Sequence, residues 1–399
     1  MRTKEIYLDN GASTKVDPEV LKAMMPYFSE KYGNASSAHI LGQESKDALE
    51  NSRKIIAKSI NAKPDEIIFT SGGTESDNLA LQEIAYTNRG KGNHIITTKI
   101  EHKAILNTCK FLEKDGAGKS EISGTTGGGF KVTYLDVNEE GFVNPKALEK
   151  AITSKTILVS IIHGNSEIGT IQDLEELGKV CKKHNVYFHT DACQSYTKTE
   201  IDVEKQNLDL VTMSGHKIHG PKGVGALFIK KGINIRPLMH GGDHEFKLRP
   251  GTENISGIVG FAEAVKLASD KKHIEHITKL RDKLIEGILK IPYVKLNGPI
   301  GDKRLCNNAN FYFKGIEGEA IVGYLDQEHI CSSTGSACSE RTLEPSHILK
   351  AIGLSNEEAN GSIRLTLSRF NTEEEIEHVL KVLPEIVKKL RQMSPLWKR

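Results

Sequence analysis

The sequence predicts an α/β fold, in which a mainly parallel sheet flanked by helices is followed by a smaller α+β part. Between residues 67 and 229, short apolar runs alternate with helical patterns, which is typical of a parallel sheet covered on both faces. After about residue 262 the pattern changes to long charged helices and separate strands. Hydrophobic residues make up 38% of the 399 residues, which is enough for a large core.

The expected elements follow from local patterns. Near the N-terminus, Asp17-Pro18-Glu19 offers an N-cap, a first-turn proline and an early acid, and so predicts a helix start. Sheet strands are expected at 67–70, 95–98, 156–162, 186–190, 208–213 and 224–229, with helices from residue 75, over 104–112 and over 174–181. The C-terminal part is expected to hold a helix over 265–289, strands at 310–313 and 362–367, and a final helix over 373–393. The Gly-, Ser- and Thr-rich run 117–129 predicts a surface loop.

Composition narrows the classes of function. The 54 Lys and Arg residues nearly balance the 52 Asp and Glu residues, for a net charge of +2, so the chain lacks the general basic field of most nucleic-acid binders. The six cysteines form no C-x-x-C pair, and we expect reduced thiols rather than a disulfide framework. The N-terminus has no apolar signal segment, and no window approaches a membrane span. We therefore expect a cytoplasmic protein that contacts neither membrane nor nucleic acid directly.

One predicted strand end carries a glycine-rich turn. Ser71-Gly72-Gly73-Thr74 follows the strand 67–70 and opens a helix. Glycines let the backbone approach an anion, and a helix N-terminus offers free N–H groups. The competing interpretation is an ordinary turn with no ligand.

Three further strand ends carry a titratable side chain. His102 follows the strand 95–98; it could stack on a cofactor ring, although a lone histidine is usually structural. Asp191 follows 186–190, at the sheet edge where such folds bind ligands; it could pair with a pyridine nitrogen or simply begin a loop. Lys217 follows 208–213, and a confined lysine can form a Schiff base, whereas most lysines carry solvated charge.

In their order and wording, these segments resemble the fold-type I pyridoxal-phosphate (PLP) enzymes of the class V aminotransferase branch, and within it the NifS/IscS-type (group I) cysteine desulfurases. The deciding segment is Ser332-Ser333-Thr334-Gly335-Ser336-Ala337-Cys338-Ser339, followed by Leu343-Glu344-Pro345-Ser346-His347. It is similar to the active-site cysteine loop of this group, in which small polar residues around a thiol suit an exposed loop. The resemblance runs from Tyr7 to Trp397.

The resemblance implies a fold and a domain division. The fold is PLP-dependent fold type I, with a seven-stranded, mainly parallel sheet flanked by helices. Residues 15–262 would form the large PLP-binding domain. Residues 1–14 and 263–399 would form a smaller α+β domain that carries the cysteine loop at about 331–343.

The resemblance also implies roles for the matching residues. The catalytic set is Cys338, which takes the sulfur as a persulfide, Lys217, the Schiff-base lysine and Cα base, and His102, the ring-stacking acid/base. Arg364 would clamp the substrate carboxylate, assisted by Asn34. The implied cofactor ligands, besides Lys217, are Asp191 at the pyridine nitrogen, Gln194 at the ring oxygen, Gly73, Thr74, Ser214 and His216 at the phosphate, Ser166, and Thr252. In this family the residue that matches Thr252 comes from the neighbouring subunit, so a homodimer is implied.

The chain departs from the family pattern at four places. Ser166 stands where the family usually has a second asparagine before Glu-Ile-Gly, which alters one cofactor hydrogen bond. Asp243 stands where glycine is common, and 117–129 resembles an insertion. The sequence ends at Arg399, whereas several relatives continue with a tail that helps to dock the iron–sulfur scaffold. Docking is therefore expected to be weaker or to use other surfaces.

The implied function is that of a cysteine desulfurase. It would convert L-cysteine to L-alanine with PLP and pass sulfur from Cys338 to an iron–sulfur scaffold protein, a tRNA-thiolation protein or both. No metal site is expected within the chain alone, because its cysteines lack a cluster-ligand spacing; Cys338 could share a [2Fe–2S] cluster with a scaffold.

Two alternatives stay open. One is another class V reaction, such as selenocysteine lyase or an aminotransferase, although a plain aminotransferase needs no thiol at Cys338. The other is a non-catalytic assembly partner, which would not need Lys217, Asp191, His102 and Cys338 together.

Overall fold

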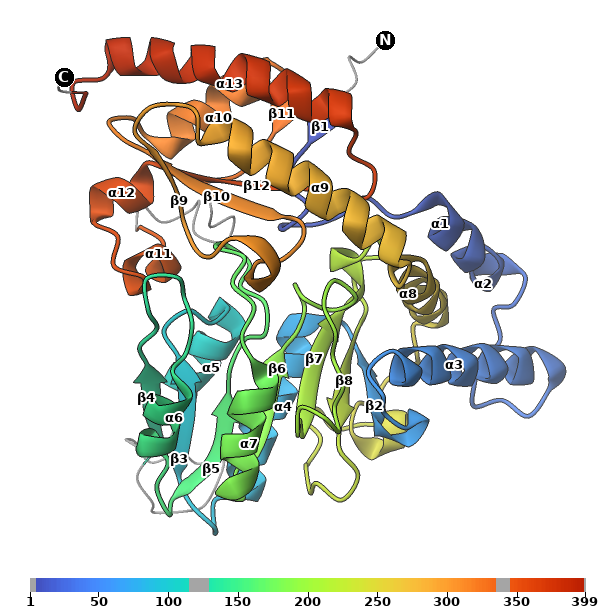
Figure 1. Ribbon diagram of the computed structural model, residues 1–399. Helices are drawn as coiled ribbons and strands as arrows, with labels where there is room; N and C mark the ends of the chain where they lie inside the picture. Colours follow the sequence, from blue (N-terminus) through green and yellow to red (C-terminus); the bar gives the residue numbers. More distant parts are fainter. Residues whose placement is uncertain (1–4, 115–128, 335–344, 398–399) are drawn as a thin grey trace.

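The computed structural model describes residues 5–114, 129–334 and 345–397 (Figure 1). Its largest element is a seven-stranded sheet with the order β2-β8-β7-β6-β5-β3-β4. All strands run in one direction except β8, which is antiparallel to its neighbours β2 and β7. The strands are β2 (Ile67–Thr70), β3 (His94–Thr98), β4 (Lys131–Leu135), β5 (Thr156–Ser160), β6 (Tyr187–Asp191), β7 (Leu210–Ser214) and β8 (Gly225–Ile229). The predicted seven-stranded, mainly parallel sheet is confirmed.

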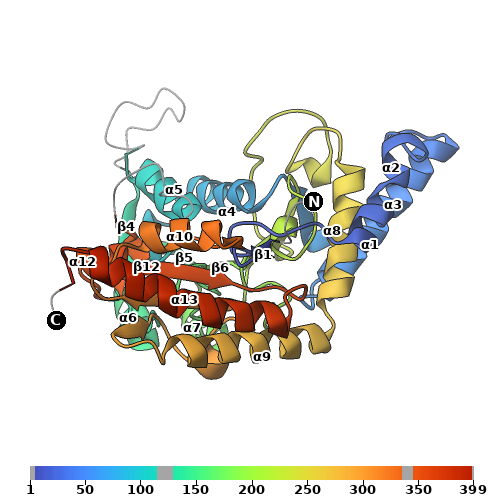
Figure 2. The same ribbon diagram turned by 90° about the horizontal axis from the view of Figure 1, so that it is seen from above.

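Helices cover both faces of this sheet (Figures 1 and 2). α4 (Gly73–Thr87) and α5 (Lys103–Lys114) share an apolar core with one face. The opposite face shares a second core with α1 (Pro18–Met24), α3 (Ile40–Lys58), α6 (Pro145–Ala151), α7 (Leu174–Lys183) and α8 (Ile255–Ala268). Short α2 (Pro26–Ser29) follows α1 at the end of the molecule that carries α3. The expected N-cap of α1 is present, since Asp17 Oδ1 accepts a hydrogen bond from Glu19 N at 2.8 Å.

A second, antiparallel sheet of order β12-β10-β9 lies at the carboxyl ends of the parallel strands (Figure 1). Its strands are β9 (Val294–Leu296), β10 (Asn308–Phe313) and β12 (Ser362–Thr366), and its own apolar core includes α9 (Lys271–Ile288), α10 (Gly318–Gln327) and α13 (Glu373–Met393). Between the two sheets, α11 (His347–Ala351) and α12 (Asn356–Asn360) pack against isoleucines of the large sheet's loops.

The N-terminal segment is built into this junction. β1 (Ile6–Tyr7) pairs in parallel with β11 (Ile330–Cys331), and Asn10 Nδ2 donates to the Thr366 carbonyl at 2.8 Å. Thr14 N then donates to the His216 carbonyl at 3.1 Å, just past β7. Residues 9–14 therefore run between the two sheets, along the carboxyl ends of the parallel strands.

The single helix predicted over 265–289 is wrong. α8 ends at Ala268 and α9 begins at Lys271, because Asp270 has an extended backbone and its Oδ1 accepts from Lys272 N at 2.9 Å as a new N-cap. Helical periodicity continues on both sides of this cap, so the pattern of apolar residues does not reveal the break.

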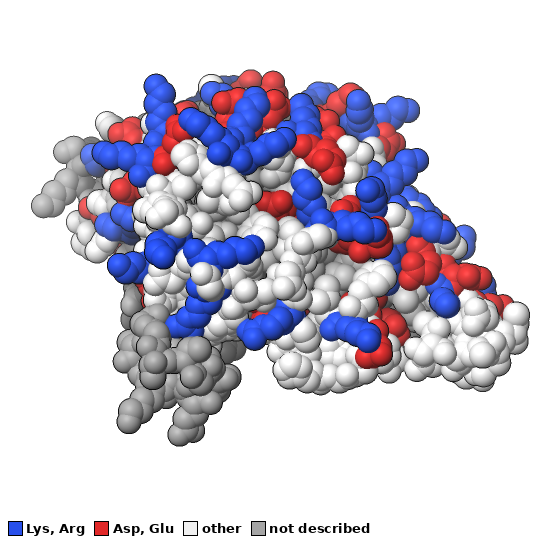
Figure 3. Space-filling model, turned by 90° about the horizontal axis from the view of Figure 1, so that it is seen from below, with Lys and Arg blue, Asp and Glu red and all other residues white. Residues whose placement is uncertain are grey.

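Three further expectations concern membrane-spanning helices, the state of the cysteines and the distribution of surface charge. No helix in the described ranges is long and apolar enough to cross a membrane. The five cysteines in those ranges are free thiols. Seen from below, basic and acidic side chains are interspersed rather than separated into fields of one sign (Figure 3).

Candidate active site

Three ionisable side chains converge at the carboxyl end of the large sheet. Asp191 ends β6, His102 lies between β3 and α5, and Asp77 lies in the first turns of α4. One ligand atom from each lies within 4.8 Å of the others, and both aspartates are buried. Cys193 N donates to Asp191 Oδ1 at 2.9 Å and so orients that carboxyl. The structure thus brings together His102 and Asp191, and adds Asp77, which no local sequence signal singles out.

A buried polar network lies behind Asp77. His189 Nδ1 is 2.9 Å from Ser160 Oγ, and its Nε2 is 3.0 Å from Thr212 Oγ1 and 3.8 Å from Asp77 Oδ1. Burial lowers the pKa of His189 to about 4, so the ring is neutral at neutral pH. Burial, and then the nearby Asp191 carboxyl, raise the pKa of Asp77 well above its ordinary value. This favours a protonated Asp77 beside Asp191.

Lys217 and Gln194 meet at one backbone carbonyl. Lys217 closes the single turn η2 (Gly215–Lys217) after β7, and its Nζ donates to the Gly11 and Ala12 carbonyls at 2.6 and 2.8 Å. Gln194 Nε2 donates to the same Gly11 oxygen at 2.8 Å. The N-terminal segment therefore joins two of the predicted cofactor residues, a function that the sequence pattern does not reveal.

The turn that opens α4 forms the second part of the site. Gly225 of β8 pairs with Thr70 on one side and Ser214 on the other, so Ser214 ends its strand at the same edge, one strand away from the start of this turn. Ser214 Oγ is buried and has no hydrogen-bond partner among the described residues. A Cβ on Gly73 would lie 2.5 Å from Cys193 Sγ, so glycine is required by close packing. A buried, unpartnered hydroxyl near a helix N-terminus suits a phosphate group.

The other two predicted phosphate residues are His216, which follows β7, and Thr74, in the first turn of α4. His216 Nδ1 lies 3.3 Å from Ser13 Oγ, and burial lowers the pKa of His216 to about 4. Its neutral ring can still donate one hydrogen bond. Thr74 is exposed and lines the same surface depression as His102.

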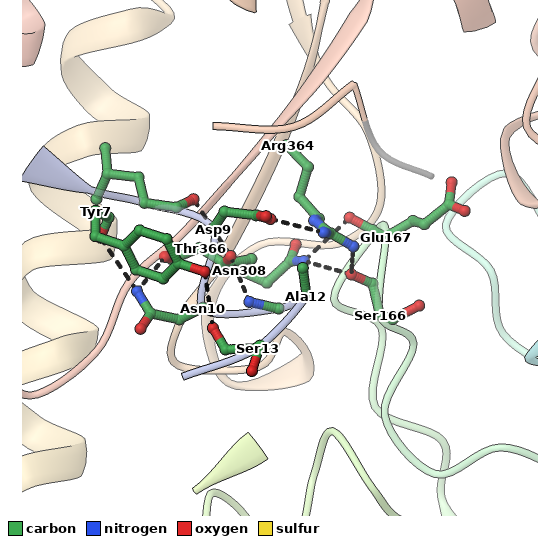
Figure 4. A network of polar contacts seen from close by, with 12 residues as sticks. Tyr7, Asp9, Asn10, Ala12, Ser13, Ser166, Glu167, Asn308, Arg364 and Thr366 are labelled. Carbon is green, nitrogen blue, oxygen red and sulfur yellow. Dashed lines mark hydrogen bonds and ion pairs between the residues drawn. The ribbon is translucent and has the colours of Figure 1, made fainter. Parts of the chain in front are cut away.

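Arg364 of β12 forms the third part of the site (Figure 4). Its Nη1 donates to the Ser166 carbonyl at 3.1 Å, and its Nη2 pairs with Asp9 Oδ1 at 3.0 Å. Ser166 therefore contacts Arg364 through its backbone oxygen. A Cβ on Gly11 would lie 3.2 Å from Arg364 Cζ, so the segment that binds Lys217 also passes the guanidinium.

Cys338 lies outside the described residues, but the described chain before it contacts Arg364 and the described chain after it contacts Glu167. Ser333 exchanges two backbone hydrogen bonds with Arg364, of 3.3 and 2.7 Å. Ser346 Oγ donates to Glu167 Oε2 at 2.5 Å, next to Ser166. Burial raises the pKa of Glu167 to about 7. Both flanks are thus attached within this part of the site.

Asn34 and Thr252 lie elsewhere. They line a surface depression with Tyr27, Lys31 and Tyr32, and Asn34 Oδ1 accepts from Ser36 N at 2.9 Å. One chain by itself does not bring either residue to Arg364 or Lys217.

The comparisons with known proteins agree with this geometry. The aminotransferase class-V family model matches residues 6–379. The chain belongs to the class-V aminotransferase family. It is 51% identical to the cysteine desulfurase IscS of Clostridium botulinum (strain Hall) over 398 residues, which is 99% of this chain and 97% of that relative. Such identity places it in the IscS/NifS-type group of the family and confirms the resemblance.

Two solved structures are similar to this class-V chain. A NifS-like protein superposes with a TM-score of 0.88 at 39% identity, covering 97% of this chain and 100% of the other. SspA in complex with cysteine superposes with a TM-score of 0.79 at 37% identity, covering 92% and 100%. The predicted fold class is thereby confirmed.

Membership of the class-V family also confirms PLP as the expected cofactor. The residues fit this group. A lysine, a carboxyl and an imidazole stand at the carboxyl ends of β7, β6 and β3, and the buried Ser214 hydroxyl at the end of β7 has no hydrogen-bond partner among the described residues.

Proposed function

We propose that this chain is a cysteine desulfurase that converts L-cysteine to L-alanine and hands the sulfur from Cys338 to a protein acceptor. The observation that carries the proposal is the place of Arg364. Its guanidinium lies beside the segment that binds Lys217, and both flanks of Cys338 are attached to Arg364 and to the neighbouring Glu167.

Each predicted residue has a part in this proposal. Bound PLP supplies an electron sink for the substrate's Cα. Lys217 holds the cofactor and accepts the Cα proton, His102 moves protons, Asp191 pairs with the pyridine nitrogen, and Gln194 binds the ring oxygen. Gly73, Thr74, Ser214 and His216 hold the phosphate, and Ser166 stands beside the cofactor. Arg364 binds the substrate carboxylate through two parallel hydrogen bonds.

The sulfur-transfer step is assigned to Cys338. Its thiolate attacks the substrate sulfur; an S–S bond forms and the Cβ–S bond breaks. Protons then complete Cβ and Cα, so that alanine leaves and Cys338 is a persulfide. The acceptor is an iron–sulfur scaffold protein, a tRNA-thiolation protein or both, and Cys338 could share a [2Fe–2S] cluster with a scaffold.

We also propose a homodimer in which Thr252 completes the partner's phosphate site. The support is a set of exposed apolar side chains on α1, α2, the start of α3 and the segments that join these helices, at the right-hand end of Figures 1 and 2: Leu21, Met25, Phe28, Tyr32 and Ile40, each at least 50% exposed. A patch of this kind favours a protein interface, and the depression of Asn34 and Thr252 shares Tyr32 with it. Asn34 would then assist Arg364 only across the interface.

The domain division and the location follow the same reasoning. Residues 15–262 are proposed as the PLP-binding domain, and 1–14 with 263–399 as the small domain, supported by the separate apolar cores of the two sheets. The free thiols support a reducing, cytoplasmic location.

An absorption spectrum before and after adding L-cysteine, with alanine and sulfide assayed in parallel, tests the function. A visible cofactor band that changes with cysteine, together with alanine, is the expected result. Cys338→Ser should keep the band and lose alanine formation, whereas the control Cys331→Ser should keep both. A protein that stays colourless after added PLP would contradict the assignment of Lys217. Selenocysteine and keto acids assayed side by side with cysteine test the other class V reactions.

A further inference from the structure

Lys198 is a second lysine at the cofactor loops. It stands four residues after Gln194, and its Nζ donates to the Gln194 carbonyl at 2.9 Å and to the Lys217 carbonyl at 3.2 Å. One ammonium group thus ties the loop after β6 to the loop after β7. Within the described ranges no carboxylate forms an ion pair with this ammonium.

The backbone before Lys198 is strained. Thr197 has φ of 63°, a left-handed conformation that β-branched residues rarely adopt. Strain of this kind persists where the surrounding structure requires a particular direction of the chain. Lys198 N donates to the Ser195 carbonyl at 2.8 Å directly after this residue, so the strained turn directs the Lys198 side chain toward Lys217.

The groups around the Lys198 ammonium are basic or weakly acidic. Lys217, His219, His273 and Arg369 line the same small cavity, and the thiols of Cys306 and Cys193 lie near. Burial, opposed by the two thiols and reinforced by Lys217, lowers the pKa of Lys198 to about 8. At neutral pH the group is therefore still mainly a cation.

We propose that Lys198 is a positioning residue for Lys217: its ammonium holds the Lys217 and Gln194 carbonyls and keeps a positive charge beside the Lys217 amine. A neighbouring cation disfavours the protonated form of a lysine, and the neutral amine is the form that attacks a carbonyl. Gln194 and Lys217 share the Gly11 carbonyl, so the two hydrogen bonds of Lys198 also maintain that shared contact. The inference rests on the proposed role of Lys217 as the cofactor lysine.

The test measures Lys217 in the full chain without cofactor. Trace acetic anhydride labels amines in a pH series, and mass spectrometry of the Lys217 peptide gives its apparent pKa. Lys198→Met removes charge and hydrogen bonds, Lys198→Gln keeps a donor without charge, and Lys198→Arg keeps the charge. The matched control is Lys230→Met, a half-buried lysine at the opposite edge of the sheet.

The expected result is a rise of about one unit in the apparent pKa of Lys217 in Lys198→Met and Lys198→Gln, with Lys198→Arg and Lys230→Met like the unchanged protein. An equal apparent pKa in all five proteins overturns the inference, as does a rise in Lys198→Met alone, because a bonding role without charge explains that pattern. Thermal melting establishes that each variant folds. If Lys198→Met does not fold, Lys198→Gln against Lys198→Arg decides.

A separate readout distinguishes failure of the proposed function. After PLP is added and reduced with borohydride, peptide mapping identifies the modified lysine. Modification of a lysine other than Lys217 would refute the proposed site. The labelling result, obtained without cofactor, would still decide whether Lys198 acts on the Lys217 amine.

Discussion

Arg364 is nearly fully buried, and its guanidinium contacts the Asp9 carboxylate and the Ser166 carbonyl. A planar guanidinium held by two contacts is oriented before a substrate arrives. The side chain therefore loses little conformational entropy when the substrate binds. An ammonium group in its place could not present two parallel donors.

Arg364→Lys should therefore reduce kcat/KM for cysteine by about 100-fold, mainly through a higher KM, while the visible cofactor band is kept. Steady-state alanine formation and the absorption spectrum check both parts. Arg391→Lys is the control, because Arg391 is also buried but donates to carbonyls of the C-terminal part, Pro292 and Tyr293 among them. Equal KM values for Arg364→Lys and the unchanged enzyme would contradict the clamp.

Glu101 makes the folded state sensitive to pH. Its Oε1 accepts from Thr98 Oγ1 at 2.7 Å and from Ile162 N at 2.9 Å, and burial raises its pKa to about 8. In the unfolded chain the Glu101 carboxyl ionises near its ordinary pKa of 4.5. Between pH 4.5 and 8 the unfolded chain therefore releases a proton that the folded chain keeps. The stabilisation from Glu101 is complete below pH 4.5 and is lost as the pH rises through about 8.

Urea unfolding in a pH series should accordingly show a falling free energy of unfolding over this window, by about 1.4 kcal/mol per pH unit for each such group. Glu101→Gln should flatten the slope by that amount, and Glu139→Gln, at an exposed position, should not. A slope unaffected by Glu101→Gln would argue against a protonated Glu101 at neutral pH.

At the scale of elements, the N-terminus of α4 is packed directly on the loop after β6. The contact is between Gly73 and Cys193, since a Cβ on the glycine would meet Sγ at 2.5 Å. Because both elements carry proposed cofactor residues, a shift of one against the other changes the phosphate site and the Asp191 site together.

Gly73→Ala should weaken PLP binding by about tenfold, because overpacking of about 1–3 kcal/mol moves α4. Removing the sulfur in Gly73→Ala/Cys193→Ala should restore most of the affinity. Gly90→Ala is the matched control, since nothing lies within 4 Å of its Cβ position. Absorption titration with PLP measures all four proteins; no recovery in the double variant would refute this packing account.

At the scale of the whole molecule, the proposed dimer divides each active site between two chains. Phe28→Asp, which buries a charge if α2 lies in an interface, should shift the protein from dimer to monomer in analytical ultracentrifugation and weaken PLP binding. Ile300→Asp is the control, because Ile300 is 71% exposed at a site away from α1 and α2. If the Phe28→Asp protein keeps the mass of the unchanged protein, α2 does not lie in the interface.

Mixed dimers test whether Thr252 acts across the interface. Thr252→Ala and Lys217→Ala should each have low activity alone, and mixing with subunit exchange should restore activity. One site of each mixed dimer then has an intact Lys217 from one chain and an intact Thr252 from the other. Mixing without recovery would mean that both residues serve the same chain's site.

The sequence alone determined the parallel sheet, six of its seven strands, and the lysine, aspartate and histidine at its carboxyl edge. Apolar runs and the residues that end them are local features, and parallel strands bring their ends to one edge whatever the loops do. β4 escaped prediction because it is an edge strand whose residues are mostly only partly buried. The break between α8 and α9 escaped because one capping side chain decides it.

Only the tertiary structure decided what surrounds those residues. Lys217 and Arg364 meet residues 9–12 across separations of 206 and 355 positions, and most of the acceptors are backbone carbonyls, which every residue type carries. The residue type therefore does not predict which carbonyls accept these hydrogen bonds. The packing of one sheet against the other determines it. Within the large sheet, the packing of α4 brings Asp77 to Asp191 at the end of β6, and the loops after β6 and β7 bring Lys198 to Lys217. The charge states of these groups then depend on burial and distance.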